Sequence, residues 1–191
     1  MLALLSVLVP AAAPATEPAP FSFEGWVGEG RPVFTAVQPV RSRLYRERSA
    51  RSAELGTCSL NAGGKLPFLS SFLVATSPLI IALDRDLERS VTWWGKLRLL
   101  TSSQYYDQGQ QKTLSFSAGS SVELLMGRAE GYCLFRAGGE VFQAGCLDFP
   151  GVKSADGAAH DWWLQVQCGK ASGWMLMDRL TLQLFKLERS G

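Results

Sequence analysis

Few side chains in this sequence are of the types that carry out enzymatic chemistry. The only histidine, His160, precedes Asp161 in a segment rich in Gly, Ala and Asp, where we expect an exposed loop. A cysteine–histidine hydrolase would need one thiol left unpaired within reach of this imidazole, whereas the cysteines form an even set of four. The sequence contains no phosphate-binding glycine loop, metal-ligand cluster or G-x-S-x-G motif. We therefore expect no catalysis, no cofactor and no metal site.

The cysteines favour disulfide bonds over metal binding. Cys58, Cys133, Cys146 and Cys168 include no C-x-x-C pair, and four cysteines allow three connectivities. A hairpin over residues 132–147, turning at two glycines, would place Cys133 and Cys146 nearly opposite each other. That geometry favours a Cys133–Cys146 bond and leaves Cys58 with Cys168. The alternative is four buried free thiols in a cytosolic protein.

The N-terminal residues have the pattern of a secretory signal. Residues 1–9 are almost wholly apolar, and an A-x-A site over residues 13–15 predicts cleavage before Thr16. The apolar run is too short for a transmembrane helix of about 20 residues, so we expect no integral membrane span after cleavage. No basic residue precedes it, which leaves an upstream start or a buried N-terminal segment as alternatives. Together with disulfides, a signal peptide over 1–15 and a proline-containing linker over 16–32 predict a periplasmic or secreted protein.

Composition limits the partners. The net charge is +2, from 19 basic and 17 acidic side chains, which gives no overall field for nucleic acid or an anionic membrane. With 47% hydrophobic residues, the chain can bury a real core. We expect partners such as a peptide, a cell-wall component or another exported protein.

The sequence predicts an all-β protein, because short apolar alternations are interrupted by Gly, Ser and Asp. The expected strands are 33–40, 58–60, 66–73, 79–83, 93–100, 114–116, 122–126, 132–136, 141–144, 162–168, 173–177 and 181–187.

Two segments repeat. Residues 57–63, TCSLNAG, and residues 113–119, TLSFSAG, share Thr, Ser, Ala and Gly at a constant spacing. Each is followed by a Trp pair that begins an alternating run, at Trp93-Trp94 and at Trp162-Trp163. This repetition predicts two small β modules in tandem, over 33–103 and 104–187.

The second copy resembles SH3 domains. Residues 114–125 match the pattern L-S-F-x-x-G-x-x-h-x-h-h, where h is apolar, and residues 163–175 are similar to the bacterial W-x-x-V…G-x-x-G-W-h pattern. The resemblance implies tandem SH3-like barrels and a ligand groove lined by Trp163, and it suggests a role in peptidoglycan targeting. Two departures are an additional segment, 147–161, and the lack of a proline after the last turn, which argues against polyproline binding.

The candidate ligand-binding residues are aromatic and basic. Strand alternation turns Trp163 and Trp94 away from the core, and Tyr106 and Trp174 are further aromatic candidates. Arg43 and Arg46, from a run of five arginines between residues 41 and 51, are candidate polar contacts for phosphate or carboxylate. The alternatives are that both Trp residues cover a seam between the modules and that the arginines form a solvated loop.

These observations predict an exported, non-catalytic protein that recognises peptide-like or cell-wall (peptidoglycan) material. The alternative is an inhibitor or immunity-type protein that binds another exported protein through the 147–161 loop, since loops of this length are often functional. A structural subunit with the Trp residues at its contacts is a third hypothesis.

Overall fold

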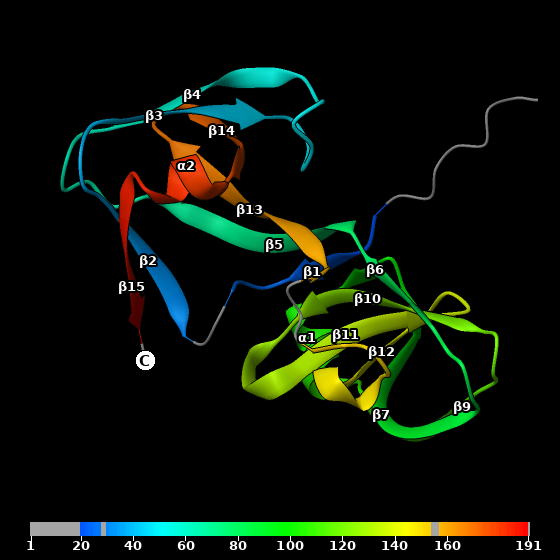
Figure 1. The fold of residues 1–191 in the computed structure, drawn as a ribbon. Helices are drawn as coiled ribbons and strands as arrows, with labels where there is room; N and C mark the ends of the chain where they lie inside the picture. The colour runs from blue at the N-terminus through cyan, green and yellow to red at the C-terminus, as the bar shows by residue number, and fades with distance from the viewer. Residues whose placement is uncertain (1–19, 28–29, 154–156, 191) are drawn as a thin grey trace, which may run out of the picture.

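The computed structural model describes residues 20–27, 30–153 and 157–190 (Figure 1). The predicted signal peptide lies outside the described residues. The described chain is all-β, as predicted, with two short α-helices. The elements are β1 (Ser22–Glu24), β2 (Arg31–Ala36), β3 (Val40–Tyr45), β4 (Glu54–Leu60), β5 (Phe68–Ser77), β6 (Leu79–Ala82), β7 (Leu87–Lys96), β8 (Leu99–Leu100), α1 (Ser102–Asp107), β9 (Gln110–Phe116), β10 (Ser121–Gly127), η1 (Ala129–Gly131), β11 (Tyr132–Ala137), β12 (Glu140–Gly145), η2 (Cys146–Asp148), β13 (Ala159–Cys168), β14 (Ala171–Leu176), α2 (Arg179–Leu182) and β15 (Phe185–Ser190).

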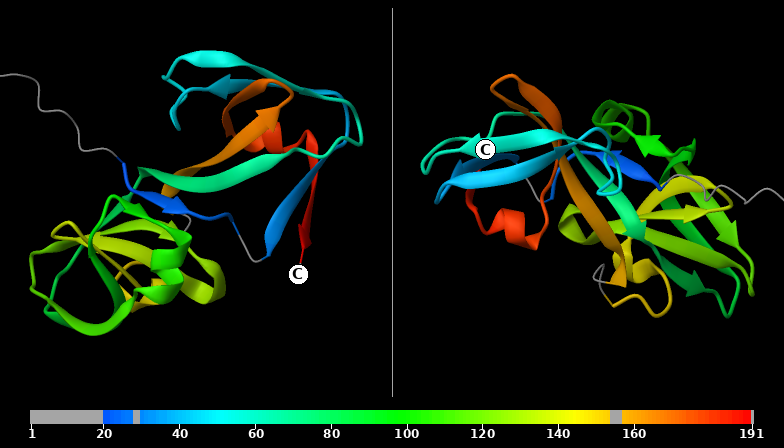
Figure 2. Two further views of the ribbon diagram at one scale, coloured as in Figure 1. Left: turned by 180° about the vertical axis from the view of Figure 1, so that it is seen from behind. Right: turned by 90° about the horizontal axis from the view of Figure 1, so that it is seen from above.

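The strands form three sheets. Seven strands are ordered β4-β3-β14-β13-β5-β1-β8, six are ordered β6-β10-β11-β12-β7-β9, and β15 pairs with β2. Within the described residues, none of these sheets closes into a barrel. Figure 2 shows two units side by side, connected where β1, β5 and β13 run. We call β2–β5 with β13–β15 and α2 the outer unit, and residues 79–152 the inner unit.

The inner unit is inserted into the outer unit. Strands β5 and β13 are antiparallel neighbours, with Ser77 opposite Ala159, although the whole inner unit lies between them in sequence. The expected boundary between residues 103 and 104 does not separate the sheets, since it falls between the paired strands β7 and β9. The segmentation into consecutive modules was therefore wrong: the first unit is completed by residues from the end of the chain.

The repeated segments have the same local structure in both units. Gly63 and Gly119 both have positive φ, +79° and +81°, in the turn that follows β4 or β9. The N–H of Gly63 donates to the Ala36 carbonyl (2.7 Å), and the N–H of Gly119 donates to the Leu83 carbonyl (2.8 Å). The positive φ at both glycines agrees with the predicted turn. In addition, each turn is hydrogen-bonded to the end of β2 or to the residue after β6.

Strand register extends this equivalence along both units. The strands β3, β4, β5, β13 and β14 of the outer unit match β7, β9, β10, β11 and β12 of the inner unit. The residue numbers differ by +47 for β3, by +56 for β4 and β5, and by −31 for β13 and β14. Both of the β5–β13 and β10–β11 ladders also contain a bulge. Residues that face each other in the outer unit therefore match residues that face each other in the inner unit. The pair Ser42–Cys58 matches Arg89–Leu114, Phe68–Val166 matches Leu124–Phe135, and Trp163–Leu176 matches Tyr132–Gly145.

The two Trp pairs, by contrast, are not equivalent. Trp163 in β13 corresponds by register to Tyr132 in β11, because Trp163 opposes Leu176 where Tyr132 opposes Gly145. Each unit contains a long hairpin, β3–β4 in the outer unit and β7–β9 in the inner unit. Trp94 lies in β7, at a position that corresponds to the turn after β3 in the outer unit. The Trp similarity was a coincidence of spacing, and it displaced the predicted module boundary.

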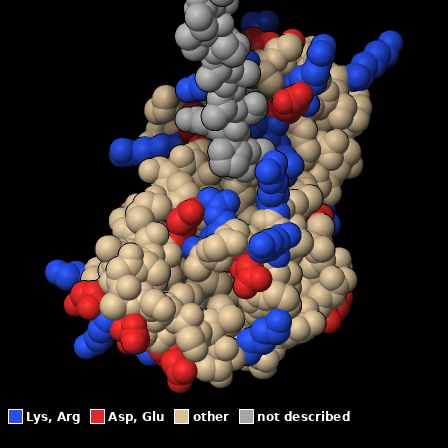
Figure 3. Space-filling model, turned by 90° about the vertical axis from the view of Figure 1, so that its right-hand side faces the viewer, with Lys and Arg blue, Asp and Glu red and all other residues tan. Residues whose placement is uncertain are grey.

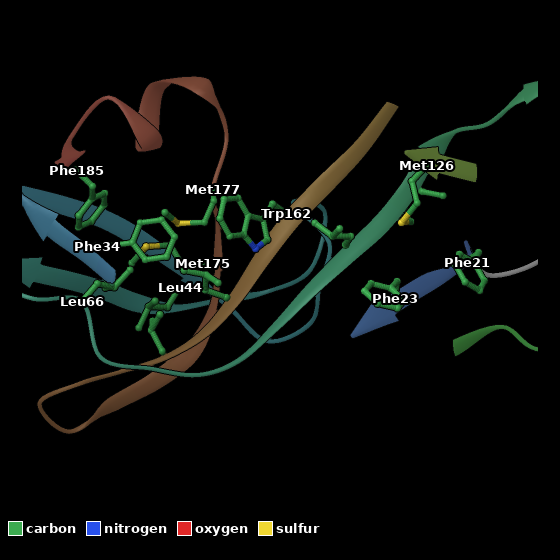
Figure 4. Close-up of a cluster of buried hydrophobic side chains, with 14 of the residues drawn as sticks. Phe21, Phe23, Phe34, Leu44, Leu66, Met126, Trp162, Met175, Met177 and Phe185 are labelled. Atoms are coloured by element: carbon green, nitrogen blue, oxygen red, sulfur yellow. The ribbon is translucent and has the colours of Figure 1, made fainter. Parts of the chain in front are cut away.

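The core runs across the junction between the units. One buried cluster combines Phe34 and Trp162 of the outer unit with Met126 of the inner unit, through Phe21 and Phe23 at β1 (Figure 4). A second cluster fills the inner unit around Phe135, Phe142 and Phe149. Residues expected to form a linker therefore contain a buried strand, β1, which pairs with β5 and β8.

Both expected disulfides are formed. Cys58 bonds Cys168, joining β4 to the end of β13, and Cys133 bonds Cys146, joining the start of β11 to η2. Each bond lies within one unit. None of the described helices has the length and apolar character needed to cross a membrane.

Candidate functional site

Trp163 does not offer a ligand surface. Its side chain is fully buried, and its ring meets the edge of Tyr45 with centroids 5.7 Å apart. The strand alternation was correct, because Trp162, Leu164 and Val166 point into the core. The opposite face is not open, however, since the Tyr45 ring of β3 packs against Trp163 there. An outward side chain on a strand is exposed only where no other element packs over that face.

Trp94 packs against helix α1, which carries the exposed residue Tyr106. Its ring stacks on Tyr105 at 5.4 Å with planes 19° apart, and its Nε1–H donates to the Gln104 carbonyl (3.0 Å). Tyr106, the next residue of α1, is 76% exposed. Trp94 therefore positions α1, while Tyr106 faces solvent.

Helix α1 begins with a capping box that its sequence encodes. The Thr101 side chain accepts from the Gln104 N–H, and the Gln104 side chain accepts from the Thr101 N–H. This reciprocal pair satisfies donors that a helix start leaves free. It fixes a six-residue helix at the end of the inner hairpin and so orients both tyrosines.

The two arginines predicted as ligand contacts, Arg43 and Arg46, lie in different depressions of the surface. Arg43 forms an exposed ion pair with Glu54 across the hairpin (3.0 Å). It lines a hollow shared with Tyr45 and the residues of α2. Arg46 lies in the turn beyond β3 and faces a different depression, together with Trp174. The structure therefore brings Arg46 and Trp174 together and leaves Arg43 outside.

We define the arginine groove as the depression of about 760 Å³ lined by Arg46, Arg48, Arg51, Val74, Asp161 and Trp174. The turn that carries the arginines is closed by its own hydrogen bonds. The Arg46 N–H donates to the Ala53 carbonyl (2.9 Å), and the Ser52 hydroxyl donates to the Glu47 carbonyl. Figure 3 views the side where the described chain begins, and basic side chains gather there.

Arg48 is held by aromatic rings. Its guanidinium carbon lies 4.2 Å from the centroid of Phe72 and 5.4 Å from that of Trp174, an arrangement that favours a cation over the ring faces. Nη1 is buried, with no hydrogen-bond acceptor among the described residues. Burial lowers the pKa of Arg48 from its ordinary value.

The Asp161 carboxyl group in the arginine groove is partly desolvated. Burial raises the pKa of Asp161 above its usual value, against the opposing effects of the Trp163 indole and His160. His160 itself lies in β13 rather than in an exposed loop, so that prediction was wrong. Burial lowers the pKa of His160, and nearby Arg128 lowers it further, while Asp161 raises it.

We define the tyrosine groove as the depression of about 480 Å³ lined by Trp26, Tyr105, Tyr106, Arg128, Tyr132 and Gln143. The Tyr105 hydroxyl donates to the Gln143 side chain. The Arg128 guanidinium lies 4.1 Å from the centroid of Phe23 and 5.3 Å from that of Tyr105.

The two grooves occupy equivalent places. By strand register, Gln143 of the inner unit corresponds to Trp174 of the outer unit, since they oppose Thr92 and Tyr45 at matching positions. Each groove lies between the end of a hairpin, β3–β4 or β7–β9, and the paired strands β5–β13 or β10–β11 of the same unit. Arg48, Asp161, Tyr105, Arg128 and Tyr132 were not selected from the sequence as site residues, and the arginine run was the one signal that included Arg48.

The 147–161 segment is partly packed. Phe149, Val152 and Ala158 are buried in the inner core, whereas Leu147 on η2 is 72% exposed. Within the described residues, no group of three or more His, Cys, Asp or Glu side chains has metal-binding geometry.

Comparison of the chain with protein-family models, with curated proteins and with solved structures found no match.

Proposed function

We propose that this chain is an exported, non-catalytic binding protein that recognises peptide-like or cell-wall (peptidoglycan) material through the arginine groove and the tyrosine groove. The observation that carries the proposal is their equivalence: two copies of one strand arrangement place a groove at the same position. Both grooves combine aromatic rings with a few polar groups, the composition typical of ligand pockets.

We further propose that each unit is an SH3-like module, one inserted into the other. Support comes from the shared order of a long hairpin, a glycine turn, three antiparallel strands and a helical turn. The last strand of the outer unit, β15, returns to its first strand, β2. Export is supported by the two disulfides, which persist in oxidising compartments.

Retention on purified cell-wall sacculi tests this function. Trp174→Ala and Tyr106→Ala should each reduce the retained fraction, because each removes an aromatic surface from one groove. Leu180→Ala is the matched control, since Leu180 is 72% exposed and lies outside both grooves. Equal retention of all four proteins would refute the assignment of the grooves, and no retention of the wild type would refute cell-wall binding.

The inhibitor-type alternative has one specific observation in its favour, the exposure of Leu147 on η2. Under that hypothesis, Leu147→Asp would abolish capture of an exported partner protein. Under our proposal, the same variant binds sacculi as well as the wild type does.

A further inference from the structure

The charges around the arginine groove are not neutralised by each other. In the described part of the chain, Arg46, Arg48 and Arg51 form no ion pair, and the ion pairs found there involve other residues. The carboxylates lining the groove belong to Glu47 and Asp161. Three arginines against two carboxylates leave a net charge of +1. That balance suits a ligand group with a single negative charge.

Arg48 is arranged to receive such a group. Its guanidinium lies against the rings of Phe72 and Trp174, which limits its movement, and its N–H donors match the two oxygens of a carboxylate. Its buried Nη1 lacks an acceptor among the described residues. A donor in that condition gains from an oxygen brought in by a ligand.

The rest of the groove is apolar enough to hold a side chain. Trp174 and Val74 line it beside the arginines, together with Pro20 at the start of the described chain. Trp174 also meets Phe72 edge-on, with centroids 5.5 Å apart, which fixes its ring. The groove thus offers a cationic end next to a rigid apolar wall.

We propose that the arginine groove binds the free C-terminal carboxylate of a peptide, with Arg48 as the main contact and the last side chain on Trp174 and Val74. This inference rests on the proposed binding function and names the ligand group that the outer unit recognises. A phosphate monoester would bring a charge nearer −2, beyond the net charge of the groove.

Calorimetric titration of the full chain with two forms of one peptide tests the inference. The probes are acetyl-Ala-Leu-Ala with a free carboxylate and the same peptide as the carboxamide. The acid should bind at least about tenfold more tightly, as expected for loss of a charge-assisted contact. Arg48→Gln should remove this preference. Arg48→Lys should restore it only in part, because an ammonium lacks the planar fork.

A matched variant separates a local contact from general charge. Arg41→Gln removes the same charge from the same hairpin, but Arg41 is exposed and lies outside the arginine groove, so the acid preference should persist. Equal binding of acid and amide, or an equal effect of Arg41→Gln and Arg48→Gln, would overturn the inference. Displacement of the acid by inorganic phosphate at equal concentration would instead assign the groove to phosphate.

Failure of this inference is distinguishable from failure of the proposed function. If sacculi retain the protein in a Trp174-dependent manner while the acid and amide peptides bind equally, the proposed cell-wall binding is supported and the proposed recognition of a carboxylate is refuted. If neither sacculi nor either peptide is bound, the proposed function itself falls.

Discussion

The enclosed side chain of Trp163 should contribute to folding rather than to ligand contact. Trp163→Ala leaves a large cavity under the β3–β4 hairpin, and we expect the free energy of unfolding to fall by about 3–5 kcal/mol. Denaturant titration measures this loss. Trp174→Ala, on the neighbouring strand and partly exposed, is the comparison and should cost less. A loss within about 0.5 kcal/mol for Trp163→Ala, the range of surface substitutions, would contradict this account.

His160 should make stability depend on pH. Its pKa is lowered in the folded protein, chiefly by burial and also by Arg128, against the opposing effect of Asp161. The unfolded chain therefore binds the proton more readily, so stability is full above the ordinary pKa of 6.5 and falls as pH decreases below it. His160→Asn should flatten this part of the profile of unfolding free energy against pH. An unchanged slope in the variant would assign the pH dependence to other groups.

At the scale of elements, the glycine turns of both units should respond alike to substitution. Gly63 and Gly119 have positive φ, and an added Cβ would meet no atom within 4 Å at either position. Only backbone strain opposes alanine there, so Gly63→Ala and Gly119→Ala should each cost about 1–2 kcal/mol of unfolding free energy. Thermal unfolding of the two variants checks the equality. A large cost at one site and none at the other would argue against equivalent turns.

The disulfides should differ in what they contribute. The Cys58–Cys168 bond closes a loop with a sequence separation of 110, whereas Cys133–Cys146 spans 13. Loop-closure entropy grows with loop length, which predicts losses of about 4.7 and about 3 kcal/mol on replacing each pair by serine. Denaturant titration of the two double variants tests the order. The reverse order would show that local packing outweighs the loop entropy.

At the scale of the whole molecule, the outer unit should fold without the insertion. Ser77 and Ala159 face each other across β5 and β13, so an Asn-Gly turn can join them directly in place of residues 78–158. We expect the shortened chain to form the Cys58–Cys168 bond and to keep the peptide binding of the arginine groove. Its stability should fall, because the core shared through Phe21, Phe23 and Met126 is lost.

Non-reducing peptide mapping and calorimetry measure both properties of the shortened chain. The control is the same chain with Cys58→Ser, which cannot form the bond. Scrambled or free thiols in the shortened chain would mean that the inner unit is required for the outer unit to fold.

The amino-acid sequence by itself determined the β class and the repeated glycine turn, and it favoured the disulfide pairing that the structure shows. These features depend on local pattern: alternation selects strands, a positive φ selects glycine, and a hairpin turning at Gly138 and Gly139 sets Cys133 near Cys146. The sequence also indicated Arg46, Trp174 and Tyr106, which line the two grooves.

Only the tertiary structure decided how the copies are nested and which aromatic faces remain open. Strands β5 and β13 pair although residues 78–158 lie between Ser77 and Ala159 in sequence. No local sequence pattern indicates such a pairing between distant strands. Likewise, Trp163 and Trp174 both lie on one face of neighbouring strands, but Trp163 is buried against Tyr45 of β3, whereas Trp174 lines the arginine groove. Exposure is a property of what packs over a residue, and that is set by long-range contacts.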